Sequence, residues 1–178
     1  MGTVCVALFR GINVGKAKRI AMADLRELLL EMGYQNVSTL LNSGNAIFEV
    51  KGRAKHAERI RTAVREHLGV DAQVIVKTRA EIAAAVAELP LPEQAAADPS
   101  RLLVAFCEGA AGLVALQPLA AQAVGEERFC VGASAAYLWC ANGILESRLP
   151  ESLLKMTGNT GTTRNWATLL KIHQTLSA

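Results

Sequence analysis

The sequence has no run of about 18 apolar residues, the length that a membrane-spanning helix requires. The apolar run from Val4 to Phe9 is too short for the hydrophobic core of a secretory signal, and no basic residue precedes it. These absences predict a cytoplasmic protein with no membrane partner, although 51% of its residues are hydrophobic. That fraction is ample for a buried core and excludes a disordered chain.

Cysteine is scarce, and its spacing fits neither a metal site nor a redox motif. The four cysteines are Cys5, Cys107, Cys130 and Cys140, and no two of them form a C-x-x-C pair. Three lie inside apolar, strand-like runs, so buried and reduced thiols are the simplest interpretation. We expect no metal and no cofactor.

Signatures of catalysis are also missing. The sequence contains no H-E-x-x-H, no G-x-S-x-G and no paired-carboxylate signature. His56 and His67 are eleven residues apart, about 16 Å along a helix, which is too far to share one metal ion. We therefore predict no catalytic residue, and an enzyme of transferase or hydrolase type stays an open alternative.

Apolar periodicity predicts a β-α-β-β-α-β order in the first half of the chain. Gly33 and Gly69 fall where the two helices should end, and a turn at residues 42–45 joins the middle strands into a hairpin. This order is that of a ferredoxin-like unit. The predicted strands are 3–9, 37–41, 46–50 and 72–77, and the predicted helices are 21–32 and 54–68.

A proline-rich stretch, residues 89–100, follows a predicted helix at 78–89 and is the best candidate for a linker. The second half then reads β-α-β-β-α. Its predicted strands are 101–107, 129–131 and 136–140, and its predicted helices are 112–124, 152–156 and 163–176. We predict an α+β protein made of two related halves, 1–90 and 91–178.

Acidic residues are absent from both ends of the chain. Residues 1–23 carry four cations and residues 152–178 carry three, and neither segment contains an acid. The segment between them has 12 basic and 16 acidic residues. An acid-free segment leaves its cations without local partners, so an external anion can take that place. Solvated cations, or pairs with distant acids, would explain the same pattern.

The loop RGINVGK, which begins at Arg10, leaves the C-terminal end of the first strand, where ligand crevices of α/β sheets lie. Gly11 and Gly15 allow positive φ, so successive amides could converge on an anion. Arg10 and Lys16 would add positive charge, and Asn13 offers two donors and an acceptor. Three residues separate the glycines, whereas a Walker loop needs four. The alternative is a loop whose glycines serve its shape alone.

A second polar segment, GNTGTTRNW, ends at Trp166. Thr162 or Thr163 is predicted to cap the final helix, whose first amides could hold an anion. Arg164 would then stand in the first turn, where a cation opposes the helix dipole, which suggests another role for it. Thr163, Arg164 and Asn165 are therefore candidate ligand-binding residues. The core face of this helix is predicted to contain Trp166, Leu169, Leu170 and His173.

The hairpin turn NSGN supplies a third polar segment. In the predicted order the first and third strands are adjacent and antiparallel, which puts Asn45 near Arg10. Ser43 and Asn45 would then present polar groups beside the first loop. The alternative is a turn with no part in binding.

These segments together predict a pocket, formed by both ends of the chain, that binds a small anion such as a nucleotide or a phosphorylated metabolite. The alternative is nucleic-acid binding through the first loop and the basic helix. Phe9 and Phe48 are then the candidate aromatics for base stacking, although the RNA-recognition consensus is absent. The basic helix and its start carry Arg53, Lys55, Arg59, Arg61 and Arg65.

Taken together, FRGINVGK, MADLRELLLEMGY, NSGNAIFE and GTTRNWATLLK resemble the bacterial domain of unknown function family 1697, over about residues 4–174. The resemblance implies a small cytoplasmic α/β protein with ferredoxin-like elements, and it implies no established activity. The positions that match the family's signature are Arg10, Gly11, Asn13, Gly15, Ser43, Gly44, Asn45, Thr163, Arg164, Asn165 and Trp166.

Overall fold

The computed structural model describes residues 2–52 and 55–178, and the chain separates into two compact units. The first unit extends to Arg79 and includes Gln174–Ala178, and the second unit is Ala80–His173. Each unit contains one four-stranded sheet in which all neighbouring strands are antiparallel. The chain is therefore α+β with two related halves. The sequence-based boundary at 90/91 falls inside the second unit.

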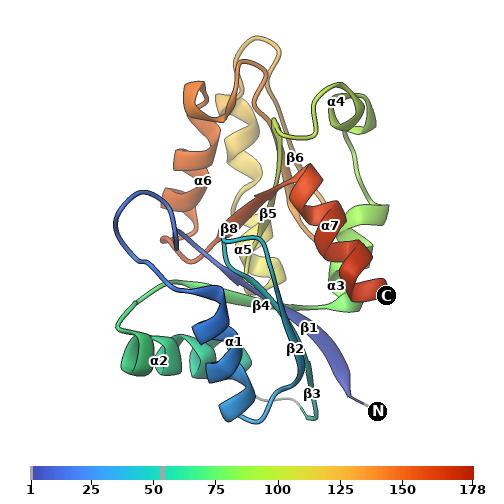
Figure 1. Cartoon of the computed structure of the whole chain (residues 1–178). Helices are drawn as coiled ribbons and strands as arrows, with labels where there is room; N and C mark the ends of the chain where they lie inside the picture. The colour runs from blue at the N-terminus through green and yellow to red at the C-terminus, as the bar shows by residue number, and fades with distance from the viewer. Residues whose placement is uncertain (1, 53–54) are drawn as a thin grey trace. The chain divides into compact units, whose positions relative to one another are not determined.

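The first unit follows the predicted β-α-β-β-α-β order (Figure 1). In its sheet, of order β2-β3-β1-β4, strand β1 pairs with both β3 and β4. The predicted start of the second helix at Ala54 lies outside the described residues, as does Arg53. The elements are β1 (Thr3–Phe9), α1 (Met22–Glu31), β2 (Gln35–Leu40), β3 (Asn45–Val50), α2 (His56–Leu68) and β4 (Val74–Thr78).

Helices α1 and α2 cover one face of this sheet (Figure 1). Leu25 and Leu29 of α1 and Ile60 of α2 pack with Phe9 and Phe48 in one buried cluster. Burial of each large apolar side chain contributes about 1.5–3 kcal/mol, so this cluster fixes the helices on the sheet. Both phenylalanines are fully buried there and are closed to a nucleic-acid base.

The second unit repeats the strand arrangement of the first. Its sheet order is β6-β7-β5-β8, so the second, third, first and fourth strands again lie side by side. Its elements are α3 (Arg79–Ala87), α4 (Pro92–Ala97), β5 (Leu102–Phe106), α5 (Ala110–Val114), the 3-10 helix η1 (Gln117–Gln122), β6 (Arg128–Val131), β7 (Ala136–Trp139), the 3-10 helix η2 (Ile144–Glu146), α6 (Leu149–Met156) and β8 (Thr162–Asn165). The chain ends with α7 (Trp166–Ser177), whose residues from Gln174 onward belong to the first unit.

The prediction missed strand β8, because it assigned these residues to the final helix. Arg164 pairs with Val104 of β5 and does not stand in a helical turn. The backbone amide of Thr168 donates to Asn165 Oδ1 at 2.9 Å, so Asn165, and not Thr162 or Thr163, supplies the helix cap. The β-branched threonines favour the strand that precedes it.

Two other predictions for the second unit were wrong. The helix predicted over 112–124 is divided into α5 and the 3-10 helix, because Pro118 has no amide proton to continue the first. The linker predicted over 89–100 contains α4, which begins at Pro92, a position where proline is tolerated.

The buried face of α7 also differs from the predicted one. Leu170 is 40% exposed, whereas Trp166, Leu169, Ile172 and Leu176 are buried. These four positions follow a spacing of three and four residues that is rotated away from Leu170. Trp166 is therefore a buried residue, as its place on the helix predicts.

No disulfide joins the four cysteines, and Cys5, Cys107 and Cys140 are buried. Over residues 2–52 and 55–178, no helix combines the length and the apolar character needed to cross a bilayer.

Candidate functional site

The loop between β1 and α1 is anchored at both ends by the core. Ile12 and Ile20 are buried in the cluster beneath α1 and α2. Between them the amide of Asn13 donates to the carbonyl of Lys18 at 3.0 Å, which closes a turn. Positive φ angles occur at Gly11 (68°), Asn13 (54°), Gly15 (65°) and Lys18 (52°), so the positive φ that the two glycines allow is present in the structure.

Asn13 fixes the shape of this loop with its side chain. Its Nδ2 donates to the carbonyl oxygens of Ile20 and Asn42, both at 2.8 Å, and its Oδ1 accepts from the amide of Ile20 at 2.9 Å. The bond to Asn42 ties the loop to the hairpin turn. The polar atoms of Asn13 are thus engaged within the protein, and its contact with a ligand stays a prediction.

The hairpin turn lies beside the loop, as the strand order predicts. Asn45 is paired with Leu8, two residues before Arg10. The Asn45 side chain is fully buried and donates to the carbonyl of Leu40 at 2.9 Å and to Ser43 Oγ at 3.2 Å. Asn45 therefore holds the turn from inside, and its role in binding, like that of Ser43, stays a prediction.

Gly44 makes the close approach of turn and loop possible. The amide of Phe9 donates to the Gly44 carbonyl at 2.9 Å. At φ 90°, a Cβ on this residue would lie 2.6 Å from Ile12 and 2.8 Å from Phe9. Only glycine fits this contact without displacing the core.

A basic surface connects the loop to α2. The Arg10 amide donates to the Gln73 carbonyl at 2.9 Å, and Gln73 Oε1 accepts from Arg61 Nη1 at 3.0 Å. Arg61 also forms a two-point contact with Asp71, at 2.7 and 3.1 Å. This hydrogen bonding holds the pKa of Asp71 below its usual range, and the charges of Arg61, Arg65 and Lys18 lower it further. Arg61 therefore contacts this exposed carboxylate, and Arg65 and Lys18 lie close enough to lower its pKa.

The candidates of the second unit lie on β8. Arg164 is buried, and its Nη1 donates to Thr162 Oγ1 at 3.1 Å and to the Thr163 carbonyl at 2.8 Å. Burial lowers the pKa of this guanidinium to about 10. Arg164 lies in a strand, so the prediction that it stands in the first turn of a helix, against the helix dipole, is wrong. The Asn165 side chain caps α7.

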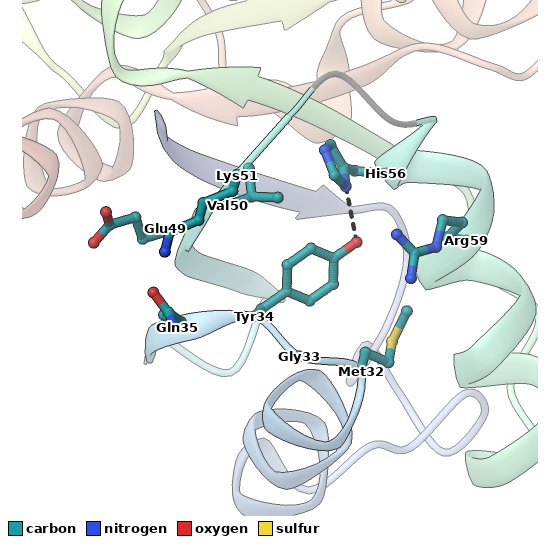
Figure 2. Close-up of a pocket in the computed structure, with 9 residues that line it drawn as sticks. All are labelled: Met32, Gly33, Tyr34, Gln35, Glu49, Val50, Lys51, His56 and Arg59. Carbon is teal, nitrogen blue, oxygen red and sulfur yellow. Dashed lines mark hydrogen bonds between the residues drawn. The ribbon is translucent and has the colours of Figure 1, made fainter. Parts of the chain in front are cut away.

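The first unit also contains a cavity that the sequence did not predict (Figure 2). It has a volume of about 190 Å³ and lies between the end of α1, the β2 and β3 strands and the start of α2. Tyr34 and His56 meet at its wall, with 3.0 Å between Tyr34 Oη and His56 Nδ1. These residues are 22 positions apart, and no spacing rule links them, because only the packing of α2 on the sheet brings them together.

Burial acts on both members of this pair. It raises the pKa of Tyr34 and lowers that of His56, while the nearby Arg59 charge lowers both. A hydrogen bond with the Gly52 backbone acts in the opposite direction and raises the pKa of His56. His56 Nε2 is buried and has no hydrogen-bond partner among the residues that the structure describes. The neutral forms of both side chains are therefore favoured.

A family model described as a protein of unknown function, DUF1697, matches residues 2–137. The chain belongs to the DUF1697 family. The resemblance read from the loop and turn motifs is thus confirmed, and the matched region contains both of them. It ends before β8, so it does not extend to the GTTRNW segment.

A solved structure shows the same fold along the whole chain. It is titled "The structure of conserved bacterial protein SP0830 from Streptococcus pneumoniae" and is 23% identical, with 99% of each chain covered and a TM-score of 0.80. No curated protein matches the chain. Membership of the DUF1697 family therefore gives a fold and no activity.

Proposed function

We propose that this member of the DUF1697 family is a binding module for a small phosphate-bearing anion, held by the loop at residues 10–19. The observation that carries the proposal is the construction of that loop. It has four cations and no acid, and Asn13 holds it in a fixed turn rather than leaving it to move.

The backbone of the loop supports this proposal. Left-handed residues at positions 11, 13 and 15 turn the chain repeatedly, an arrangement that can direct neighbouring amides toward one anion. Val14 is 71% exposed, and Gly15 and Lys16 are also exposed, so this part of the loop faces solvent. An anion seated there would be held by backbone amides and by the side chain of Lys16.

The test is a thermal-shift panel of nucleotides, pyrophosphate and phosphorylated metabolites at millimolar concentration. A ligand at 100 times its Kd adds about 2.7 kcal/mol, so the melting temperature should rise by about 5 °C or more. In Lys16→Gln the increase in melting temperature should be much smaller, because the anion loses a positive charge. Lys16 is exposed, so the substitution should leave the fold intact. Lys155→Gln is the matched control, since Lys155 forms an exposed ion pair on α6. If none of the panel stabilises the wild type, the proposal fails.

A second candidate function is nucleic-acid binding, and the basic surface favours it. Lys18, Arg61 and Arg65 lie close enough together to act on the same carboxylate. Such a surface can bind phosphates of a strand without reading its bases. The burial of Phe9 and Phe48 argues against stacking, so binding would be independent of sequence.

The salt dependence of binding to a labelled oligonucleotide tests this second candidate. Three phosphate contacts predict a slope of about −2 to −3 in a plot of log K against log salt. No binding at about 50 mM salt would exclude it. The double variant Arg61→Gln/Arg65→Gln should make this slope shallower. Lys16→Gln alone should make it shallower by no more than about one unit.

The repeated strand order supports a structural proposal as well. We propose that each unit is a ferredoxin-like unit, because each places its second, third, first and fourth strands side by side in an antiparallel sheet.

A further inference from the structure

The cavity of the first unit combines apolar lining residues with the cation Arg59, which is itself exposed to solvent. Met32, Tyr34 and Val50 supply apolar surface. The Arg59 guanidinium points toward the Tyr34 hydroxyl (Figure 2). Within residues 2–52 and 55–178, no hydrogen bond or ion pair holds this guanidinium. A cation beside the buried Tyr34 and the half-buried His56, with no ion-paired carboxylate, favours an anion from outside.

The acid of the cavity does not neutralise Arg59. Glu49 points away from the Tyr34–His56 pair in Figure 2, and its Oε2 accepts from Asn36 Nδ2 at 2.8 Å. Lys51 lines the rim. Two cations and one carboxylate give the lining a net charge of +1 with His56 neutral, so a single negative charge is the best match.

The size of the cavity limits the rest of the ligand. An engineered apolar cavity of about 150 Å³ holds one benzene molecule. A volume of about 190 Å³ thus accommodates a six-membered ring with a carboxylate attached. An aromatic ring of this size would make favourable contacts with the edge of Tyr34 and with the Met32 thioether.

We propose that this cavity binds a small aromatic monocarboxylate, with its carboxylate on Arg59 and its ring against Met32 and Tyr34. This site is separate from the loop and from the basic surface of the proposed function. Arg59 and Arg61 are two residues apart on α2, so their side chains leave the helix about 200° apart around its axis. The two arginines therefore serve different surfaces of the same helix.

The experiment is a titration of the ¹⁵N-labelled protein with benzoate, followed by amide chemical shifts. We expect saturable shifts at residues 33–35 and 49–51, with a Kd in the millimolar range. Benzamide has the same shape without the charge and should bind about tenfold more weakly, because it loses a charge-assisted hydrogen bond. Inorganic phosphate should not shift these amides.

Two arginine variants decide the assignment. Arg59→Gln should weaken benzoate binding about tenfold, and Arg59 is exposed on its helix, so the variant should fold. Arg65→Gln, on the Asp71 side of the same helix, should bind as the wild type does. Absence of benzoate shifts, equal affinity in Arg59→Gln, or shifts confined to the 10–19 loop would each overturn the proposal. The last result would instead support the anion site of the proposed function.

Discussion

Asn13 donates from its Nδ2 to the carbonyl oxygen of Asn42 at 2.8 Å and so joins the loop after β1 to the turn before β3. The same side chain makes two more hydrogen bonds, both to Ile20. A loop that carries four cations and no acid is therefore held by a neutral amide. Lys16, Lys18 and Arg19 of this loop are exposed, while Asn13 fixes the backbone.

The first prediction concerns this amide. Asn13→Ala should lower the free energy of unfolding by about 2–3 kcal/mol, because three hydrogen bonds are lost. Chemical denaturation measures the change.

Asn36→Ala is the matched control for Asn13→Ala. Asn36 also has a positive φ, 52° against 54° for Asn13, so alanine suffers the same backbone strain at both positions. Asn36 makes one exposed side-chain hydrogen bond, to Glu49. Equal destabilisation of the two variants would show that strain, and not the three hydrogen bonds, accounts for the effect.

The second prediction concerns Glu88, which follows α3. Its carboxylate accepts hydrogen bonds from the amides of Ala133, Ser134 and Ala135, at 3.0 to 3.3 Å, and from Tyr137 Oη at 2.9 Å. Glu88→Ala should lower the free energy of unfolding by about 3 kcal/mol, because the turn amides lose a charged acceptor. Thermal or chemical unfolding measures this.

Tyr137→Phe provides a double-mutant cycle with Glu88→Ala. Tyr137 is fully buried, and its hydroxyl also contacts the Ala85 carbonyl at 2.6 Å. The two substitutions should be non-additive by about 0.5 kcal/mol or more, since they share a hydrogen bond. Strict additivity would mean that the carboxylate and the hydroxyl act independently. In the wild type, burial and the Glu88 carboxylate raise the Tyr137 pKa, which keeps the hydroxyl protonated as a donor.

The loop and the turn could be predicted from sequence because their signals are local. Gly11, Gly15 and Gly44 each mark a position whose positive φ the structure contains, and strand alternation places the turn beside the loop. Strand β8 could not be found in this way. Thr162–Asn165 is short, and only its pairing with β5 distinguishes it from the start of a helix.

The basic helix shows a second limit of the sequence pattern. The sequence-based prediction names Arg59, Arg61 and Arg65 together as cations of one basic helix, without separating its faces. A spacing of four residues keeps Arg61 and Arg65 together, and a spacing of two sends Arg59 to the other side. The helical period alone would have separated them. The Tyr34–His56 contact depends on long-range packing and has no such signal.

The third prediction is a pH dependence due to His56. Burial lowers its pKa in the folded protein, while the unfolded chain titrates near the usual value of about 6.5. Just below that value the unfolded state binds more protons, so the free energy of unfolding falls as the pH decreases through this window. His56→Gln should remove this part of the slope. His67→Gln, a substitution near the end of the same helix, should retain it. Identical slopes in the wild type and His56→Gln would exclude His56 as the source.

The last prediction separates stability from binding at Asp71. Its pKa is lowered first by the hydrogen bond to Arg61, so the carboxylate stabilises the fold above its unfolded pKa and loses that contribution as the pH falls through the folded one. Asp71→Asn should therefore be less stable than the wild type at neutral pH and should lose less stability on acidification.

The same substitution removes the acid among Lys18, Arg61 and Arg65, so binding of an oligonucleotide should become tighter and more salt-dependent. Fluorescence anisotropy at several salt concentrations measures the binding, and denaturation between about pH 3 and 7 measures the stability. Glu151→Gln, which breaks the exposed pair with Lys155, is the control for loss of a surface ion pair. Weaker oligonucleotide binding by Asp71→Asn would mean that the carboxylate orders the arginines for their ligand instead of competing with it.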